Sequence, residues 1–167
     1  METTENVGQD NQRQAALLGY MAGIIDGEGC IRMSRNKTQG QYSFRVQVGM
    51  VELAAIELLH KTFGGTIREE RVQNRRSIYR WTIGKKAELA YFLEVMEPML
   101  MIKQPQLQCM KDWLGWAVRD RSKAPASLSD EELLRREELF LRMKQLNAVG
   151  AAATTNRDDT REGEVIV

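Results

Sequence analysis

Small residues recur at every fourth position in the first apolar segment of the chain, at Ala15, Gly19, Gly23 and Gly27. This spacing places them on one face of a helix that we predict over residues 14–25. Each Gly costs about 1 kcal/mol relative to Ala in a helix interior, so local stability does not explain them. Such a flat face allows another helix backbone to approach closely, either within the domain or, about a two-fold axis, from a second copy of the chain.

The same segment ends in Asp26 and Glu28, with Gly27 between them and Gly29 after them. If two copies cross along the small-residue face, two Glu28 carboxylates converge, and carboxylate oxygens are suitable ligands for Mg²⁺ in phosphodiester hydrolysis. Glycine on both sides leaves backbone carbonyls accessible to the same ion. The segment therefore predicts a homodimer that completes a metal site, with an interface that includes Gly19, Ala22, Gly23 and Asp26.

Charge is distributed unevenly along the chain. Residues 30–86 contain 12 Lys and Arg against 4 Asp and Glu, a net charge of +8, although the whole chain carries only +1. A basic block inside an otherwise acidic chain is typical of a surface that binds a polyanion. A merely solvated basic surface is the alternative at this point.

Apolar and polar residues alternate within the basic block, over residues 30–37 and 41–50 and again over residues 66–72 and 77–83. This period of two predicts two hairpins of one antiparallel sheet with an apolar and a polar face. The polar face carries Arg with Gln, Ser, Thr and Asn, which are the side chains that bind phosphates and base edges in nucleic acids. We expect the contact set to be Arg32, Ser34, Asn36, Gln41, Ser43, Arg45, Gln47, Arg68, Glu70, Arg76, Arg80 and Thr82.

Helical patterns precede, separate and follow the two hairpins, which predicts an α+β fold with helices packed on one face of the sheet. We expect a flexible N-terminus over residues 1–13, a core over residues 14–120 and a linker over residues 121–128. A Ser129…Glu132 capping box predicts a C-terminal helix over residues 129–146. The remaining residues, 147–167, have little to bury and are expected to be a disordered tail.

Several chemistries are excluded by the residues that the chain lacks. It has one histidine, His60, and two distant cysteines, Cys30 and Cys109, so it offers neither a zinc site nor a histidine-based triad. No apolar run reaches the roughly 18 residues that span a bilayer, and the polar, acidic N-terminus resembles no targeting signal. We therefore expect an intracellular protein, cytoplasmic or nucleoid-associated or organellar, without secretion or membrane attachment.

Residues 20–31, YMAGIIDGEGCI, resemble the LAGLIDADG motif of homing endonucleases in its Asp-Gly-Glu-Gly variant. The order of helices and hairpins, the FGG stretch at residues 63–65 and the MLMIKQPQ stretch at residues 99–106 strengthen the resemblance, which covers roughly residues 14–120. It implies the αββαββα fold of that family, with a saddle-like, four-stranded antiparallel sheet. The chain holds one such motif, and single-motif members of the family are homodimers.

The resemblance also implies roles for particular residues. Glu28 matches the catalytic, metal-binding carboxylate, and Gly27 matches the neighbour whose carbonyl contacts the metal. Asp26 matches the acidic residue that hydrogen-bonds the helix end, and Lys103 matches the catalytic basic residue near the scissile phosphate. The chain departs from the pattern at residues 49–51, Gly-Met-Val, where relatives often carry a polar residue that orients solvent.

The function implied by the resemblance is that of a Mg²⁺-dependent homing endonuclease, with Mn²⁺ expected to substitute, in a mobile genetic element such as an intron. Such an enzyme cuts double-stranded DNA at a long pseudo-palindromic target, across the minor groove, and leaves 3′ overhangs. Two alternatives use the same fold: a group I intron maturase, whose partner is intron RNA, and a catalytically silent DNA-binding protein. A charge substitution at Glu28 separates these classes.

Overall fold

The sheet has four strands in the order β1-β2-β4-β3, and all neighbouring strands are antiparallel. The computed structural model of this chain describes residues 4–36, 41–71, 73, 76–117 and 129–158. The strands are β1 (Gly29–Asn36), β2 (Gln41–Met50), β3 (Thr66–Glu70) and β4 (Ile78–Ile83). The two predicted hairpins are therefore present, and each pairs consecutive strands.

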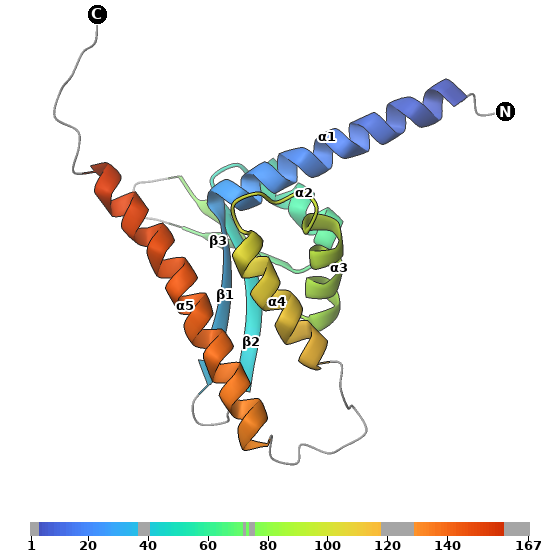
Figure 1. The fold of residues 1–167 in the computed structure, drawn as a ribbon. Coiled ribbons are helices and arrows are strands. Elements are labelled where there is room, and N and C mark those ends of the chain that lie inside the picture. The colour runs from blue at the N-terminus through green and yellow to red at the C-terminus, as the bar shows by residue number, and fades with distance from the viewer. Residues whose placement is uncertain (1–3, 37–40, 72, 74–75, 118–128, 159–167) are drawn as a thin grey trace, which may run out of the picture.

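The helices cover one face of this sheet, as the single apolar face of the strands requires (Figure 1). They include α2 (Leu53–Phe63), α3 (Lys86–Met96) and α4 (Gln104–Ala117). Phe44 and Trp81, from β2 and β4, are fully buried beneath them, in line with the alternation of the sequence. The predicted fold class is confirmed. Among the described residues, no helix combines the length and apolar character needed to cross a bilayer.

Helix α1 (Thr4–Glu28) begins ten residues before the expected start at Gln14. Its C-terminal part packs on the sheet, whereas its N-terminal part projects away from the rest of the molecule (Figure 1). Extending a helix that is already nucleated adds one hydrogen bond for each residue fixed, and residues 4–13 contain no proline to stop it. Residues 4–13 of the segment expected to be flexible are therefore helical in the structure, because polar composition says little about propagation from a packed helix, and residues 1–3 lie outside the described part of the chain.

Helix α5 (Asp130–Asp158) follows the predicted cap, since the backbone N–H of Glu132 donates to Ser129 Oγ at 3.3 Å. Its Leu139 and Met143 are buried in the core. The helix continues beyond the expected end at residue 146, through an Ala-rich stretch with high helix propensity. The predicted disordered tail is therefore helical as far as Asp158. The expected linker, 121–128, and the last nine residues, 159–167, lie outside the described part of the chain.

Two glycines are required by close backbone contacts. A Cβ atom at Gly29 would collide with the carbonyl oxygen of Ile25, where α1 passes directly into β1. Gly65 has a φ of +88°, and a Cβ atom there would collide with the carbonyl oxygen of Thr82. The first glycine allows the helix to end beside the strand, and the second allows β3 to start against β4.

Candidate nucleic-acid interface and catalytic centre

The end of α1 is joined to the start of α4 through Asp26. Its carboxylate accepts hydrogen bonds from the backbone N–H groups of Met101 at 2.8 Å, Ile102 at 3.2 Å and Lys103 at 3.1 Å. A carboxylate is stabilised at a helix N-terminus by the partial positive charge of the free N–H groups. Asp26 therefore bonds a helix end, as the resemblance implied, but that end belongs to α4 rather than to its own helix.

Lys103 completes the junction in the opposite direction. Its Nζ donates to the backbone carbonyl oxygen of Asp26 at 2.7 Å. Lys103 immediately precedes α4, a position where the helix dipole disfavours a cation, yet its ammonium lies at the C-terminal end of α1, where the dipole favours one. The structure thus places the Lys103 ammonium two residues from Glu28 along α1, although the two residues are distant in sequence.

Glu28 is exposed at the last position of α1, and no other described residue binds its carboxylate through a hydrogen bond or ion pair. Gly27 is also exposed, with open space where a side chain would stand. Carboxylate and carbonyl oxygens are hard ligands of the kind that Mg²⁺ prefers, so this pair fits the ion. Over the described part of the chain there is no cluster of three or more His, Cys, Asp or Glu that could hold a metal.

The outer face of the sheet, opposite the helices, is hollowed. The hollow has a volume of about 580 Å³, and all of its lining side chains are polar or charged. Sequence reasoning missed Thr66, although the alternation of β3 places it on the same face as Arg68. The lining residues are Arg32, Arg45, Gln47, Thr66, Arg68, Glu70, Arg80 and Thr82.

The other predicted contact residues lie outside this hollow. Ser34 pairs with Ser43, and Asn36 pairs with Gln41, in the part of the first hairpin that is farther from Glu28. By strand alternation they share the outer face with the hollow. Arg76 is exposed but precedes β4, so no strand register fixes its position.

Arginine also occurs on the inner face, where it has a different environment. Arg35, on β1, donates to Glu137 of α5, and the Tyr42 hydroxyl donates to the same carboxylate at 2.6 Å. The hydrogen bond with Glu137 raises the pKa of Arg35. Burial, followed by the hydrogen bond with Glu137, raises the pKa of Tyr42. Both side chains are committed to holding α5 against the sheet.

The expected dimer-interface residues divide between the two faces of α1. Gly19 and Gly23 are exposed, and nothing lies within 4 Å of a Cβ atom placed on either. The place of Ala22 in the interface stays a prediction, and in the single chain Ala22 is only 5% exposed and belongs to the core. The reason is angular: Ala22 lies on the helix face that packs on the sheet, about 100° away from Gly23. Asp26 is half-buried and bonded to α4 as described above.

A family model described as LAGLIDADG endonuclease matches residues 21–117, which is more than half of the chain. This chain therefore belongs to the LAGLIDADG endonuclease family, and the resemblance seen in the sequence is confirmed. The match includes the end of α1, the whole sheet and α4.

Solved structures share the fold. The homing endonuclease I-TnaI is 23% identical, with a TM-score of 0.61 over 78% of this chain and 93% of that chain. The archaeal intron-encoded homing endonuclease I-Vdi141I, complexed with DNA, is 15% identical, with a TM-score of 0.64 over 80% of this chain and 85% of that chain. The LAGLIDADG meganuclease I-AabMI, bound to uncleaved DNA, is 16% identical, with a TM-score of 0.57 over 74% of this chain and 43% of that chain. No curated protein matches this chain in sequence.

Proposed function

We propose that this protein is a homodimeric, site-specific endonuclease that cuts double-stranded DNA at a long pseudo-palindromic target. The observation that carries the proposal is the position of Glu28: an exposed carboxylate without a partner in the described chain, at the point where α1 enters the basic sheet. Membership of an endonuclease family supports the reaction class. The DNA complexes of I-Vdi141I and I-AabMI, which share the fold, support duplex DNA as the substrate.

The dimensions of the sheet suit a DNA half-site. Strand β1 has eight residues, which span about 25 Å at about 3.3 Å each. Each DNA strand rises about 3.4 Å per nucleotide, so β1 would follow about seven base pairs. The major groove, about 12 Å wide, admits a two-stranded ribbon. Residues near Glu28 would then contact the inner base pairs of a half-site, and Asn36 and Gln41 the outer ones.

The exposed residues around the end of α1 support a dimer. Gly19 and Gly23 form an open face, and Met101 and Ile102, 85% and 71% exposed, flank the helix end through their bonds to Asp26. Burying these apolar side chains against a second copy would remove them from water. In addition, the chain spans 43% of I-AabMI, so two copies together approach the length of that protein.

The proposed chemistry uses the Glu28 carboxylate and the Gly27 carbonyl as Mg²⁺ ligands from each copy, with Mn²⁺ as a substitute. The bound ion would act as a Lewis acid on the scissile phosphate and would lower the pKa of water. The Lys103 ammonium would neutralise charge on the same phosphate. Because the minor groove is only about 6 Å wide, two active sites at the dimer axis would cut the two strands across it, leaving 3′ overhangs.

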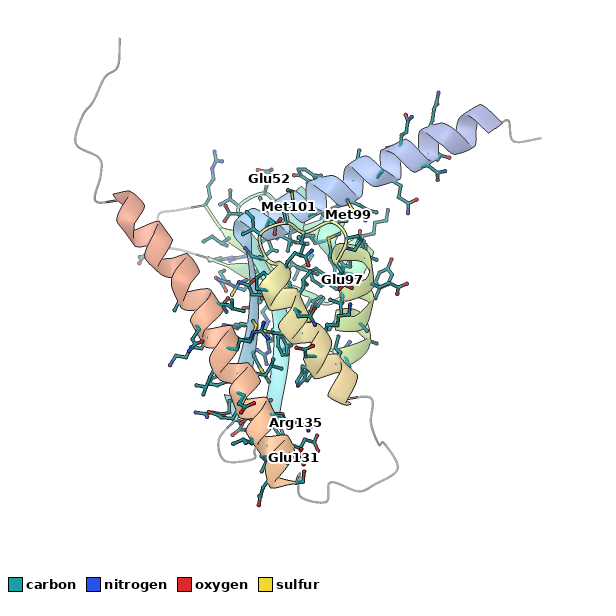
Figure 2. All side chains as sticks on the ribbon, viewed as in Figure 1. Glu52, Glu97, Met99, Met101, Glu131 and Arg135 are labelled. Carbon is teal, nitrogen blue, oxygen red and sulfur yellow. The ribbon has the colours of Figure 1, made fainter. Side chains whose placement is uncertain are left out.

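The test is cleavage of a randomised duplex library with Mg²⁺ by the native protein, Glu28→Gln and the control Glu52→Gln. Glu52 is exposed and lies close to the end of α1 in the view of Figure 2. Discrete cuts with 3′ overhangs by the native protein and the control, but not by Glu28→Gln, would support the proposal. Equal cutting by Glu28→Gln would remove Glu28 from the mechanism.

The two alternatives give different results in the same experiment. A maturase would bind intron RNA and assist splicing, with weak or absent DNA cleavage. A silent DNA-binding protein would retain salt-sensitive duplex binding without cleavage, and Glu28→Gln would change little.

The dimer is tested separately with Gly23→Leu and the control Gly115→Leu in sedimentation experiments. Both glycines lie in helices with open space around them in a single chain, so neither substitution meets a steric obstacle within the fold. We expect Gly23→Leu alone to give monomers. Dimers of unchanged stability in Gly23→Leu would contradict an interface along this face.

A further inference from the structure

One arginine on the outer face of the sheet differs from the others because it is already held by a carboxylate. Arg80 Nε donates to Glu70 Oε1 at 2.7 Å, and Arg80 Nη2 donates to Glu70 Oε2 at 2.8 Å. Two parallel bonds of this kind fix the plane of the guanidinium as well as its position. The side edge of Arg80 is thus occupied, whereas its end edge, formed by Nη1 and Nη2, keeps donors for a ligand.

The neighbouring strand leaves room for this orientation. Gly49 of β2 is the register partner of Arg80, and a Cβ atom at Gly49 would lie 3.7 Å from Arg80 Nη1 and 3.9 Å from its Cζ. The guanidinium therefore lies beside the place where a side chain of β2 would stand. Within the described residues, no hydrogen bond engages Nη1.

Among the residues that the structure describes, no carboxylate binds the surrounding arginines in this way. Arg32 and Arg45 face each other directly across β1 and β2, and Arg68 faces Arg80 across β3 and β4. Like charges directly opposite each other repel, and a phosphate bound between Arg32 and Arg45 would relieve this repulsion. The Glu70–Arg80 pair has no net charge. The hydrogen bond between them raises the pKa of Arg80 and lowers that of Glu70, so both remain ionised near neutral pH.

A neutral, oriented fork adds little attraction for the DNA backbone, but it can recognise a base. Guanine presents two acceptors, O6 and N7, to the major groove, and a guanidinium edge matches them with two hydrogen bonds. We propose that Arg80 reads one guanine in each half-site through Nη1 and Nη2, and that Glu70 is the positioning residue that holds it in register over Gly49. This inference rests on the proposed function, since it requires DNA on the outer face.

The strand register also predicts where that guanine lies. Gly29 pairs with Val48, so Gly49 and Arg80 stand at the level where α1 ends, whereas Arg45 is four residues farther along β2. Four residues correspond to about 13 Å, or about four base pairs. We therefore expect the guanine about four base pairs closer to the dimer axis than the contacts of Arg32 and Arg45.

The experiment selects the target from a randomised library and then measures binding of the native protein and its variants to every single-base change in it. The native protein should prefer guanine at one inner position of each half-site by about 5- to 150-fold. Arg80→Lys keeps the charge but loses the fork, so it should lose this preference and keep the others. Glu70→Gln should weaken the preference at the same position, and Glu70→Asp should retain part of it.

Glu69→Gln is the matched control, because Glu69 is the neighbouring carboxylate, bound to Ser77 and Arg71 rather than to Arg80. It should leave the profile unchanged. A uniform loss of affinity at all positions in Arg80→Lys would identify Arg80 as a phosphate contact and overturn the inference. An unchanged guanine preference in Glu70→Gln would overturn the role of Glu70. If the native protein selects no duplex target, the proposed function itself fails; a selected target without an inner guanine contradicts only the inference.

Discussion

Arg32 and Arg35 lie three residues apart on β1 and differ only in the face of the sheet that they occupy. Arg32 points outward into the hollow and has no partner in the described chain. Arg35 points inward, donates to Glu137 and lies 4.9 Å from the centre of the Phe140 ring. Arginine therefore contributes to folding on the inner face and is left available for a polyanion on the outer face. The alternation of side chains along the strand decides which face each arginine occupies.

The same difference holds for the two faces as wholes. The inner face buries apolar side chains, such as Phe44 and Trp81, and its Arg35 attaches α5. The outer face carries polar and charged side chains around an open hollow. Substitutions on the inner face should therefore change stability, and substitutions on the outer face should change DNA binding.

The largest expected effect is that of Phe44→Ala on stability. Phe44 is fully buried, and its ring centre lies 5.3 Å from that of Trp113. We expect a loss of about 3–5 kcal/mol in the free energy of unfolding, from lost burial and the cavity left behind. Its outward neighbour Arg45→Ala should change that free energy by no more than about 0.5 kcal/mol. Urea denaturation measures the free energy of unfolding of both variants. Similar losses in the two variants would contradict the expectation that only the inner face determines stability.

Removal of the Glu137 carboxylate should have the next largest effect on stability. Glu137→Ala leaves Arg35 and Tyr42 without the carboxylate that accepts their hydrogen bonds. We expect the free energy of unfolding to fall by about 1–2 kcal/mol, a figure that already allows for the partial exposure of the pair. Glu138→Ala is the control, because Glu138 is exposed on the same helix. Equal denaturation midpoints for the two variants would show that Glu137 does not hold α5.

On the outer face, Arg45→Ala should change the salt dependence of DNA binding. Each lost phosphate contact reduces the slope of log K against log salt by about 0.9, so two copies in a dimer lose about 1.8. Lys111→Ala is the control, since Lys111 lies on α4 and is paired with Glu97. Binding titrations between 50 and 200 mM salt, roughly the range over which such slopes are measured, test the prediction. If Arg45→Ala and Lys111→Ala change the slope by the same amount, Arg45 does not contact a phosphate.

The smallest effect concerns the pH dependence of the inner face. Because the pKa of Tyr42 is raised in the folded protein, its contribution to stability is fully present below the ordinary tyrosine value, about 10, and is lost as the pH rises through the raised value. Tyr42→Phe should therefore be less stable than the native protein at pH 8, and the two should converge in strong alkali. Unfolding free energies measured across that range, with Tyr20→Phe as an exposed control, would detect it; a constant difference at all pH values would contradict it.

Local patterns in the sequence determined much of this molecule. The alternation along the strands fixed the two faces of the sheet, and with them the outward position of Arg32, Arg45 and Gln47. Helix periodicity predicted that Gly19 and Gly23 share one face of the first helix. The Asp-Gly-Glu-Gly stretch predicted that Glu28 lies at the end of that helix. These features depend on the period of a single element, which neighbouring residues establish without reference to the rest of the chain.

Only the tertiary structure decided how distant elements meet. It placed the Lys103 ammonium at the carbonyl end of α1 and joined Glu70 to Arg80 beside Gly49. It also extended α1 and α5 beyond the limits that composition suggested. Each of these outcomes depends on packing between elements or on propagation from a packed helix, and such contacts leave no period in the sequence from which they could be predicted.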